Sequence, residues 1–232
     1  MSKKYNKSYH YDDSPEGTEF IRIFNKIRLY QERYGLKVIM ITSPNISEGK
    51  STTAAYLAST AARSTTGTTV LIDCDLRRPS INKKFGIDNL PGTAEILTHG
   101  GELRQFIQAT AFPNLKIITA GKTVKSPVEL LSSKNMSELI KRLQFHFQTV
   151  IVDAPPILPV SDALLLSNLV QGIFLVVKAG STTKKTARRA VELLQDNSTK
   201  IISSFINNMK GAMPYQYDYY SYNYKYYKKE KP

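Results

Sequence analysis

The chain has 232 residues, a formal net charge of +13 and a single cysteine. This length fits one α/β domain with short appendages, and the lone Cys74 excludes an internal disulfide framework or a cysteine zinc site. No apolar run approaches the roughly 18 residues of a membrane span, and no signal-peptide core follows Met1, so we expect a soluble intracellular protein. The basic charge favours acidic partners such as nucleotides, nucleic acid or an anionic membrane surface.

The first predicted element is an amphipathic helix. Ser14 and Pro15 form a typical helix start, with a hydroxyl cap followed by a proline in the first turn. We expect the helix to run to about residue 33 and a flexible N-terminus to precede it over residues 1–13. Its apolar residues share one face, so the helix has to pack on the main domain or on another subunit; they are Phe20, Ile23, Phe24 and Ile27.

The chain after Gly35 alternates between apolar strands and helical segments. The predicted strands cover residues 36–42, 69–73, 115–119, 149–153, 172–177 and 200–206, and the predicted helices cover residues 50–63, 135–147, 162–168 and 184–194. This alternation predicts one α/β domain over residues 14–210, with a doubly wound, mostly parallel sheet of the P-loop NTPase type. Ligands bind at the carboxyl ends of the strands in such sheets, so a site is expected in the loops there.

The loop between the first strand and the next helix has phosphate-binding features. Residues 43–52 read SPNISEGKST, which matches a Walker A loop except that Pro44 replaces the usual first glycine. Lys50 is expected to reach the terminal phosphates, and Ser51 is expected to ligate Mg²⁺. Backbone N–H groups of such a loop cradle phosphates, so we assign nucleotide binding to Ser47, Glu48, Gly49, Lys50, Ser51 and Thr52.

Carboxylates follow two further predicted strands. Asp73 and Asp75 alternate at the end of one strand and so project to the same side, and Asp153 ends an apolar strand as in a Walker B motif. Each aspartate alone could be a turn or helix cap, but beside Lys50 and Ser51 they form a phosphoryl-transfer set around Mg²⁺. We predict catalytic roles for Lys50, Asp73, Asp75 and Asp153, and metal ligation by Ser51, Asp75 and Asp153. The sequence has no guanine-recognition motif and therefore favours ATP.

The C-terminal segment, residues 211–232, holds eight of the fourteen tyrosines. Residues 215–227 include no aliphatic side chain and cannot bury much surface, so we expect a flexible tail. The tyrosines could instead form an edge strand, a sticky low-complexity segment or a platform for nucleic-acid bases. The candidate phosphate acceptors are Tyr215, Tyr217, Tyr219, Tyr220, Tyr222, Tyr224, Tyr226 and Tyr227.

Together these motifs resemble the bacterial tyrosine kinases of capsular and exopolysaccharide systems, in the form of the separate cytoplasmic kinase of Gram-positive bacteria. The resemblance runs from residue 14 to the end and rests on the Walker A loop, the doubled aspartates with the arginine that follows, the Asp-x-Pro motif at Asp153 and the tyrosine tail. It implies an ATP- and Mg²⁺-dependent protein-tyrosine kinase. Such a kinase would phosphorylate its own tail between subunits and regulate polysaccharide synthesis or export.

The resemblance also implies roles for single residues. The three aspartates would organise the metal and deprotonate the attacking tyrosine, with Asp75 as the preferred base. Asn207, after the last strand, would contact the base of the nucleotide, although it could equally be a turn residue. Pro127 begins a stretch that recurs in the family, and it favours a helix start there.

Partners follow from the same resemblance. Family members form rings through an N-terminal helix, residues 14–34 here, which carries the pattern Glu-x-x-Arg-x-x-Arg. The resemblance therefore implies ring formation; Glu19 and Arg22 match the pattern, whereas Asn25 departs from it. The kinases are switched on by the cytoplasmic end of a membrane-spanning adaptor of the polysaccharide chain-length regulator type. Such an adaptor would recruit a cytoplasmic chain to the inner face of the cell membrane.

Two other functions fit parts of the sequence. A partitioning- or positioning-type ATPase would use the same loop, but those relatives carry a signature lysine where this chain has Asn45. A nucleic-acid-binding protein would use basic residues and stacked tyrosines. The basic residues are spread along the chain, however, and we interpret clusters such as Arg77-Arg78 and Lys83-Lys84 mainly as solvated faces. We therefore expect protein-tyrosine substrates rather than a nucleic-acid partner.

Overall fold

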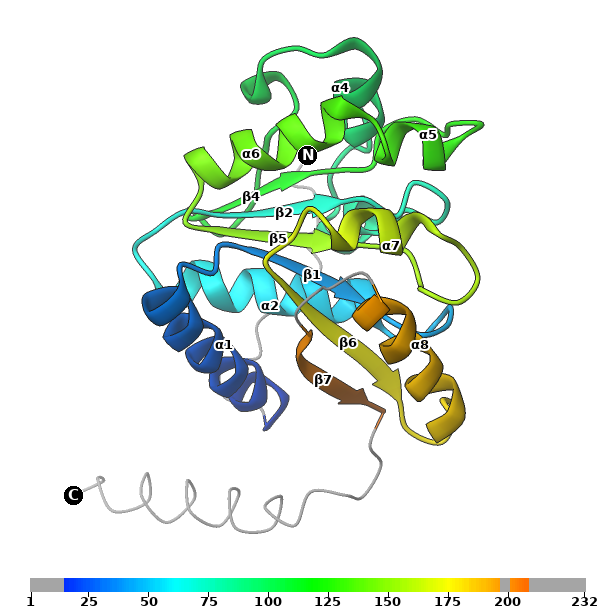
Figure 1. The fold of residues 1–232 in the computed structure, drawn as a ribbon. Helices are drawn as coiled ribbons and strands as arrows, with labels where there is room; N and C mark the ends of the chain where they lie inside the picture. Colours follow the sequence, from blue (N-terminus) through cyan, green and yellow to red (C-terminus); the bar gives the residue numbers. More distant parts are fainter. Residues whose placement is uncertain (1–14, 197–200, 209–232) are drawn as a thin grey trace, which may run out of the picture.

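One sheet with helices on both faces forms the body of the computed structural model, which describes residues 15–196 and 201–208 (Figure 1). Within these residues the sheet has seven strands in the order β3-β4-β2-β5-β1-β6-β7. The neighbouring strands pair in parallel apart from the short edge pair of β3 and β4, which is antiparallel. The α/β, doubly wound, mostly parallel fold predicted from the sequence is confirmed.

Strands and helices alternate along the chain. The strands are β1 (Val38–Thr42), β2 (Thr69–Asp73), β3 (Gln108–Ala109), β4 (Leu115–Ile118), β5 (Thr149–Asp153), β6 (Gly172–Lys178) and β7 (Ile201–Asn207). The helices are α1 (Pro15–Tyr34), α2 (Lys50–Ser64), α3 (Ile81–Phe85), α4 (Thr93–His99), α5 (Pro127–Leu131), α6 (Lys134–His146), α7 (Asp162–Ser167) and α8 (Lys184–Asp196), with a 3₁₀ turn at Leu103–Gln105. Every strand and helix predicted from the sequence is present, with small shifts at the ends.

The short elements between β2 and β4 were not predicted from the sequence. Helices α3 and α4 span only a few residues each, and β3 has only two, so no apolar period can develop within them. Helix α5 does begin at Pro127, as expected from the preference of proline for the first turn. The predicted N-terminal segment, residues 1–13, and the tyrosine-rich tail lie outside the described residues.

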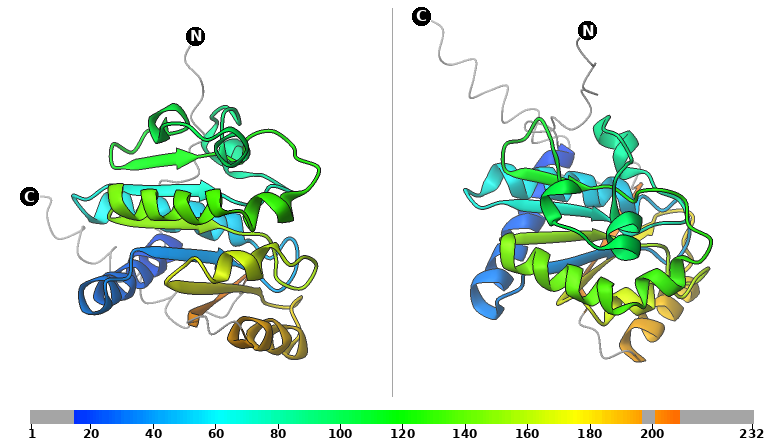
Figure 2. Two further views of the ribbon diagram at one scale, coloured as in Figure 1. Left: turned by 45° about the horizontal axis from the view of Figure 1, so that its top comes forward. Right: turned by 90° about the horizontal axis from the view of Figure 1, so that it is seen from above.

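The central strands are apolar on both sides because helices cover both faces of the sheet (Figures 1 and 2). On β1, Val38 and Met40 face one core, which also contains residues of α6, α7 and α8. Ile39 and Ile41 face the other core, which contains residues of α1, α2 and α3. Both faces of β1 are therefore buried, and its position in the middle of the sheet is fixed by packing.

Helix α1 packs on the main domain, which was one of the two arrangements that the sequence left open. Phe24 and Ile27 are buried in the core beneath it. The ring of Phe20 lies 5.1 Å from that of Tyr56 on α2 and 5.4 Å from that of Phe205 on β7, measured between centroids. The helix is thus joined to two elements that lead to the carboxyl edge of the sheet.

The carboxyl ends of β1, β2 and β5 lie side by side. Asp73 of β2 is aligned with Asp153 of β5, and Asp153 is aligned with Ile41 of β1. This edge therefore gathers the loop after β1 and the two acidic strand ends in one place. Within the described residues, none of the helices combines the length and the apolar character that crossing a membrane requires.

Candidate active site

The loop after β1 has the backbone conformation that a phosphate-binding loop needs. Ser47 and Gly49 adopt left-handed conformations, with φ values of 60° and 97°. At Gly49 a Cβ atom would lie 2.2 Å from Nδ2 of Asn207, so glycine is required for space as well as for conformation. Helix α2 begins directly afterwards at Lys50 and directs its free N–H groups into the loop.

Glu48 holds this loop in place. Its side chain is 1% exposed, and its Oε2 accepts a hydrogen bond from the N–H of Asn45 at 3.0 Å. Its Oε1 accepts a hydrogen bond from the hydroxyl of Thr182, and its carbonyl accepts one from Nδ2 of Asn207 at 2.8 Å. These bonds explain how the loop forms with Pro44 in place of a glycine. Glu48 was predicted to bind the nucleotide, but its carboxylate is hydrogen-bonded to Asn45 within the loop and to Thr182.

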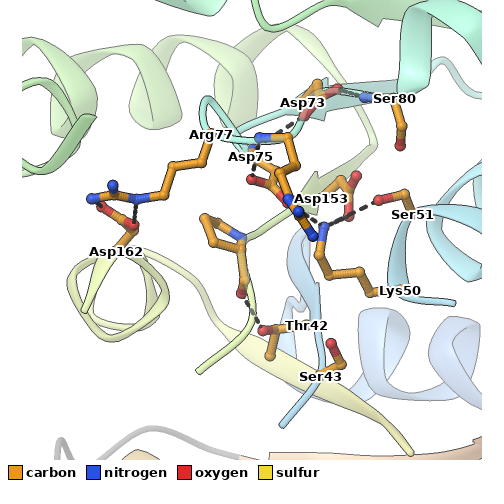
Figure 3. A network of polar contacts seen from close by, with 12 residues as sticks. Thr42, Ser43, Lys50, Ser51, Asp73, Asp75, Arg77, Ser80, Asp153 and Asp162 are labelled. Atoms are coloured by element: carbon orange, nitrogen blue, oxygen red, sulfur yellow. Dashed lines mark hydrogen bonds and ion pairs between the residues drawn. The ribbon is translucent and has the colours of Figure 1, made fainter. Parts of the chain in front are cut away.

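Lys50 lies at the centre of a buried polar cluster (Figure 3). Its Nζ is 2.7 Å from Oδ2 of Asp75 and 3.5 Å from Oδ1 of Asp153, and it donates to Oγ of Ser51 at 3.1 Å. Burial lowers the pKa of Lys50, but Asp153 and Asp75 raise it by more, and the resulting pKa is raised. The ammonium is therefore charged and positioned for an anionic ligand.

Asp73 uses its carboxylate differently from Asp75. Its Oδ1 accepts the N–H of Asp75 at 3.0 Å, and its Oδ2 accepts those of Ser80 and Ile81, each at 3.1 Å. Burial and the nearby Asp153 raise the pKa of Asp73 to about 8, while the backbone donors act in the opposite direction. The structure thus brings Asp75 to Lys50 and places Asp73 on the turn that leads into α3.

Asp153 is fully buried, and within the described residues neither of its carboxylate oxygens has a hydrogen-bond partner. The chain that follows explains this. The N–H groups of Ala154 and Ile157 donate to carbonyls of β1 and of the loop after it, at 3.0 and 2.9 Å. Pro155 and Pro156 have no N–H group. Burial is the largest cause of the raised pKa of Asp153; Lys50 and the Ser51 hydroxyl oppose the rise, and Asp75 adds to it.

The oxygen atoms of Asp153, Asp75 and Ser51 fit a magnesium ion that is bound together with phosphates. A buried carboxylate without donors is stabilised by a cation, and Mg²⁺ prefers hard oxygen ligands. Asp153, Asp75 and the Ser51 hydroxyl would hold it. The described part of the chain has no cluster of three or more acidic, histidine or cysteine side chains that could bind a metal alone.

A cavity of about 480 Å³ opens at this edge of the sheet. Its walls come from the loop after β1 with the first turn of α2, from the segment after β2, and from the proline-rich segment after β5. The predicted residues that line it are Ser47, Gly49, Lys50, Ser51, Thr52 and Asp75. The remaining predicted residues, Glu48, Asp73, Asp153 and Asn207, lie behind this lining and contact it as described above.

Two basic residues that the sequence assigned mainly to solvated faces form contacts at the cavity, although Arg77 is itself exposed and Lys84 is half-buried. Arg77 donates from Nε to Oδ2 of Asp162 at 2.6 Å and from a terminal nitrogen to Oδ1 at 3.2 Å, and Asp162 is fully buried. Lys84 donates from Nζ to Oγ1 of Thr52 at 2.7 Å. Both line the cavity. The position of Arg77 two residues after Asp75 was a usable signal, whereas nothing local to Lys84 distinguishes it from Lys83.

The candidate oligomerisation residues lie on the outer face of α1. Glu19 and Arg22 form an ion pair with each other, and their side chains are 39% and 62% exposed. Asn25 is exposed beside them. Arg28 pairs with Glu32 at 3.8 Å, one turn further along. These side chains are accessible to a neighbouring subunit, and their use in a ring stays a prediction.

Fold and site together define a P-loop nucleotide-binding protein of the ParA type: the chain matches the family described as "ParA: NUBPL iron-transfer P-loop NTPase" over residues 36–231. Among curated proteins, the tyrosine-protein kinase YwqD of Bacillus subtilis is 39% identical over 186 residues, which cover 80% of this chain and 78% of YwqD. The chain therefore belongs to the bacterial tyrosine kinases, which transfer a phosphate from ATP to protein tyrosine.

Solved structures agree with this assignment. The kinase domain of the Escherichia coli tyrosine kinase ETK superposes with a TM-score of 0.82 and 27% identity, covering 94% of this chain and 88% of that domain. The kinase domain of VpsO has a TM-score of 0.75 and 31% identity, with 87% of this chain and 100% of that domain covered. The similarity thus extends over more than four fifths of this chain in both cases.

Proposed function

We propose that this chain uses ATP and Mg²⁺ to phosphorylate the tyrosines of residues 211–232, with the tail of one subunit entering the site of another, and that this reaction regulates capsular or exopolysaccharide synthesis or export. One observation carries the phosphoryl-transfer part: a buried, unsatisfied carboxylate at Asp153 lies beside the ammonium of Lys50 at the base of the cavity. Membership of the tyrosine-kinase family and the eight tail tyrosines support tyrosine as the acceptor.

The roles of the residues follow from their positions. Lys50 binds the terminal phosphates, and the N–H groups of the loop and of the start of α2 bind the remaining phosphate oxygens. Asp153, Asp75 and Ser51 would hold Mg²⁺, which would supply positive charge to the transferred phosphoryl group. Charge stabilisation and alignment therefore come from groups that the fold has already fixed.

Asp75 is the first candidate for the base. Unlike Asp73, it lines the cavity, and it lies within 2.7 Å of Lys50. Its carboxylate would accept the proton of the tyrosine hydroxyl as the phenolic oxygen attacks the terminal phosphorus of ATP and the bond to ADP breaks. Asp73 would contribute by holding the turn on which Asp75 stands, since it accepts the Asp75 N–H.

Asn207 is proposed to contact the base of the nucleotide. It stands at the end of β7 with its amide against the carbonyl of Glu48, beside Gly49. Glu48 and Thr182 would fix the loop between this residue and the phosphates. The base and the phosphates would then be bound by elements that are hydrogen-bonded to one another.

The proposed partners concern the surface of α1 and the membrane. The exposed pair Glu19 and Arg22 would contribute to a ring of subunits, so that one subunit's tail meets the next subunit's cavity. A membrane-spanning adaptor of the chain-length regulator type would activate the kinase and recruit it to the inner face of the membrane. Membership of the bacterial tyrosine kinases supports both ideas.

The first test is mass spectrometry of the purified chain after incubation with Mg-ATP, with and without a candidate adaptor peptide. Wild type should gain phosphate on residues 215–227. Lys50→Met should lower the rate of this phosphorylation by at least about a thousandfold. Lys141→Met, an exposed lysine on α6, is the matched control and should behave as wild type. ATP hydrolysis with an unmodified wild-type tail would instead support the positioning-type ATPase.

Transfer between subunits has its own test. Lys50→Met with an intact tail is mixed with wild-type enzyme truncated after residue 210. Phosphate on the inactive subunit's tail is expected, because the truncated subunit keeps its site and lacks acceptors. A tail that stays unmodified in this mixture, while intact wild type modifies its own, would show that transfer occurs within one subunit.

A further inference from the structure

The lining of the cavity carries more cations than its own carboxylates neutralise. Four basic residues line it: Lys50, Arg77, Arg78 and Lys84. Lys50 is paired with two aspartates of the site, and Arg77 is paired with a buried aspartate at the start of α7. Over residues 15–196 and 201–208, no carboxylate lies within ion-pair distance of Arg78 or Lys84. The lining therefore has positive charge left for an anion.

Lys84 is the better placed of these two residues. Its ammonium donates to Oγ1 of Thr52, in the first turn of α2, at 2.7 Å. The Lys84 side chain is half-buried, and burial lowers its pKa despite the attraction of Asp153. Arg78, in contrast, is exposed. An ammonium has three donors, so Lys84 keeps two for a ligand beside the helix turn that begins at Lys50.

The position of Lys84 is set by the short helix that carries it. Ile81 and Phe85 are buried and anchor α3 in the core. The N–H groups of Ser80 and Ile81 are held by the carboxylate of Asp73 at 3.1 Å. The backbone that carries Lys84 is therefore held in place. Asp73 contributes to this because it accepts the N–H groups at the start of α3.

We propose that Lys84 is a second phosphate-binding lysine of this site, contacting the phosphate chain of ATP from α3 while Lys50 contacts it from α2, and that Asp73 is the residue that positions it. The inference rests on the proposed function only in taking a nucleotide as the ligand. It assigns Asp73 a positioning role rather than a part in the chemical step.

The test compares Lys84→Met with Lys83→Met, which removes the same charge from the exposed neighbour on the same helix. Dissociation constants for Mg-ATP and Mg-ADP are measured by titration calorimetry. Lys84→Met should weaken Mg-ATP binding by about tenfold, the expected effect of losing one charged hydrogen bond, and Lys83→Met should leave it unchanged. The affinity for Mg-ADP then indicates whether the contact is to an inner or to the terminal phosphate.

A purely structural role for Lys84 predicts another pattern. If the lysine only joins α3 to α2, Lys84→Met lowers the temperature of unfolding while its nucleotide affinity equals that of Lys83→Met, and this result overturns the proposal. Lys84→Arg should recover most of the affinity because it restores the charge. Lys84→Gln is measured in parallel, since it keeps a donor for Thr52 without the charge.

A double-mutant cycle tests the role of Asp73. Asp73→Asn should weaken nucleotide binding in wild type but add little in the Lys84→Met background, because both changes remove the same contact. Fully additive losses would overturn the positioning role. Nucleotide affinity can be measured without any phosphate transfer to tyrosine. A chain that binds ATP but leaves its tail unmodified would therefore contradict the kinase proposal, while the Lys84 proposal could still be tested.

Discussion

The segment after β2 and the segment after β5 both begin at a buried aspartate, but they differ in whether they supply hydrogen-bond donors to its carboxylate. Each begins with an aspartate that closes a buried strand, and Asp73 and Asp153 are aligned as neighbours in the sheet. Both are 0% exposed. The carboxylate of Asp73 accepts three backbone N–H groups, whereas in the described residues that of Asp153 accepts none. Position at a strand end therefore does not determine what a carboxylate does.

The difference comes from the residues that follow each aspartate. After Asp73 the chain turns back and directs the N–H groups of Ser80 and Ile81 to the carboxylate. After Asp153 come two prolines, and the neighbouring N–H groups are bonded to carbonyls of β1 and its loop. A carboxylate with satisfied oxygens organises backbone, and one without donors remains available to a cation.

The largest expected effect follows from removing the unsatisfied carboxylate. Asp153→Asn should reduce tail phosphorylation by at least about a thousandfold, because Mg²⁺ loses an anionic ligand. The same variant should unfold at a higher temperature than wild type without nucleotide, because the buried Asp153 carboxylate has no hydrogen-bond donor among the described residues and Lys50 keeps its closer partner Asp75. Phosphotyrosine by mass spectrometry and thermal unfolding test both statements, with Asp88→Asn, an exposed aspartate, as the control. A less stable Asp153→Asn would contradict the comparison.

Removing the satisfied carboxylate should have the opposite effect on stability. Asp73→Ala leaves three backbone donors without their acceptor and should lower the free energy of unfolding by about 2–3 kcal/mol. Asp153→Ala should not lower it. Urea denaturation of the two variants measures the contrast. Equal stabilities would show that the hydrogen bonds of Asp73 contribute nothing that solvent cannot replace.

Sequence reasoning predicted the long elements of the fold because their apolar periods are clear and bounded by turn residues. It also located Lys50, Ser51, Asp75 and Asp153, since strand ends of a parallel sheet meet at one edge. It treated Asp73 and Asp75 alike, because alternation along a strand says nothing of the turn beyond it. Lys84 was missed because the five-residue helix that presents it is too short to leave a period in the sequence.

A third effect concerns the ion pair between Arg77 and Asp162, which joins the two segments. Arg77 lies after β2, and its partner Asp162 lies after β5 at the start of α7. Arg77→Met would leave the buried Asp162 carboxylate without this partner and should cost about 1–2 kcal/mol, reduced by the 38% exposure of the Arg77 side chain. Arg78→Met, which breaks no ion pair of the described residues, is the control for unfolding. A loss equal to that of the control would show that the bridge does not stabilise the fold.

The smallest effect is a dependence on pH. The pKa of Asp73 is raised from 3.8 to about 8, so the folded state keeps a proton that the unfolded state has lost between these values. The stabilisation from this group is present below the unfolded pKa and is lost as the pH rises through the folded pKa; between pH 7 and 8 the loss is about 1 kcal/mol. Unfolding of Asp73→Asn in the same buffers should show a shallower slope. Parallel slopes would mean that Asp73 is ionised throughout this range.

The aromatic contacts of α1 join this helix to two elements that contribute to the nucleotide site. Phe20 lies beside Glu19 on this helix and packs on Tyr56 and Phe205. Tyr56 belongs to the helix that begins at Lys50, and Phe205 belongs to the strand that ends at Asn207. A subunit that docks on Glu19 and displaces α1 would therefore shift both α2, which begins at Lys50, and β7, which ends at Asn207. Subunit assembly would then change the geometry of the nucleotide site.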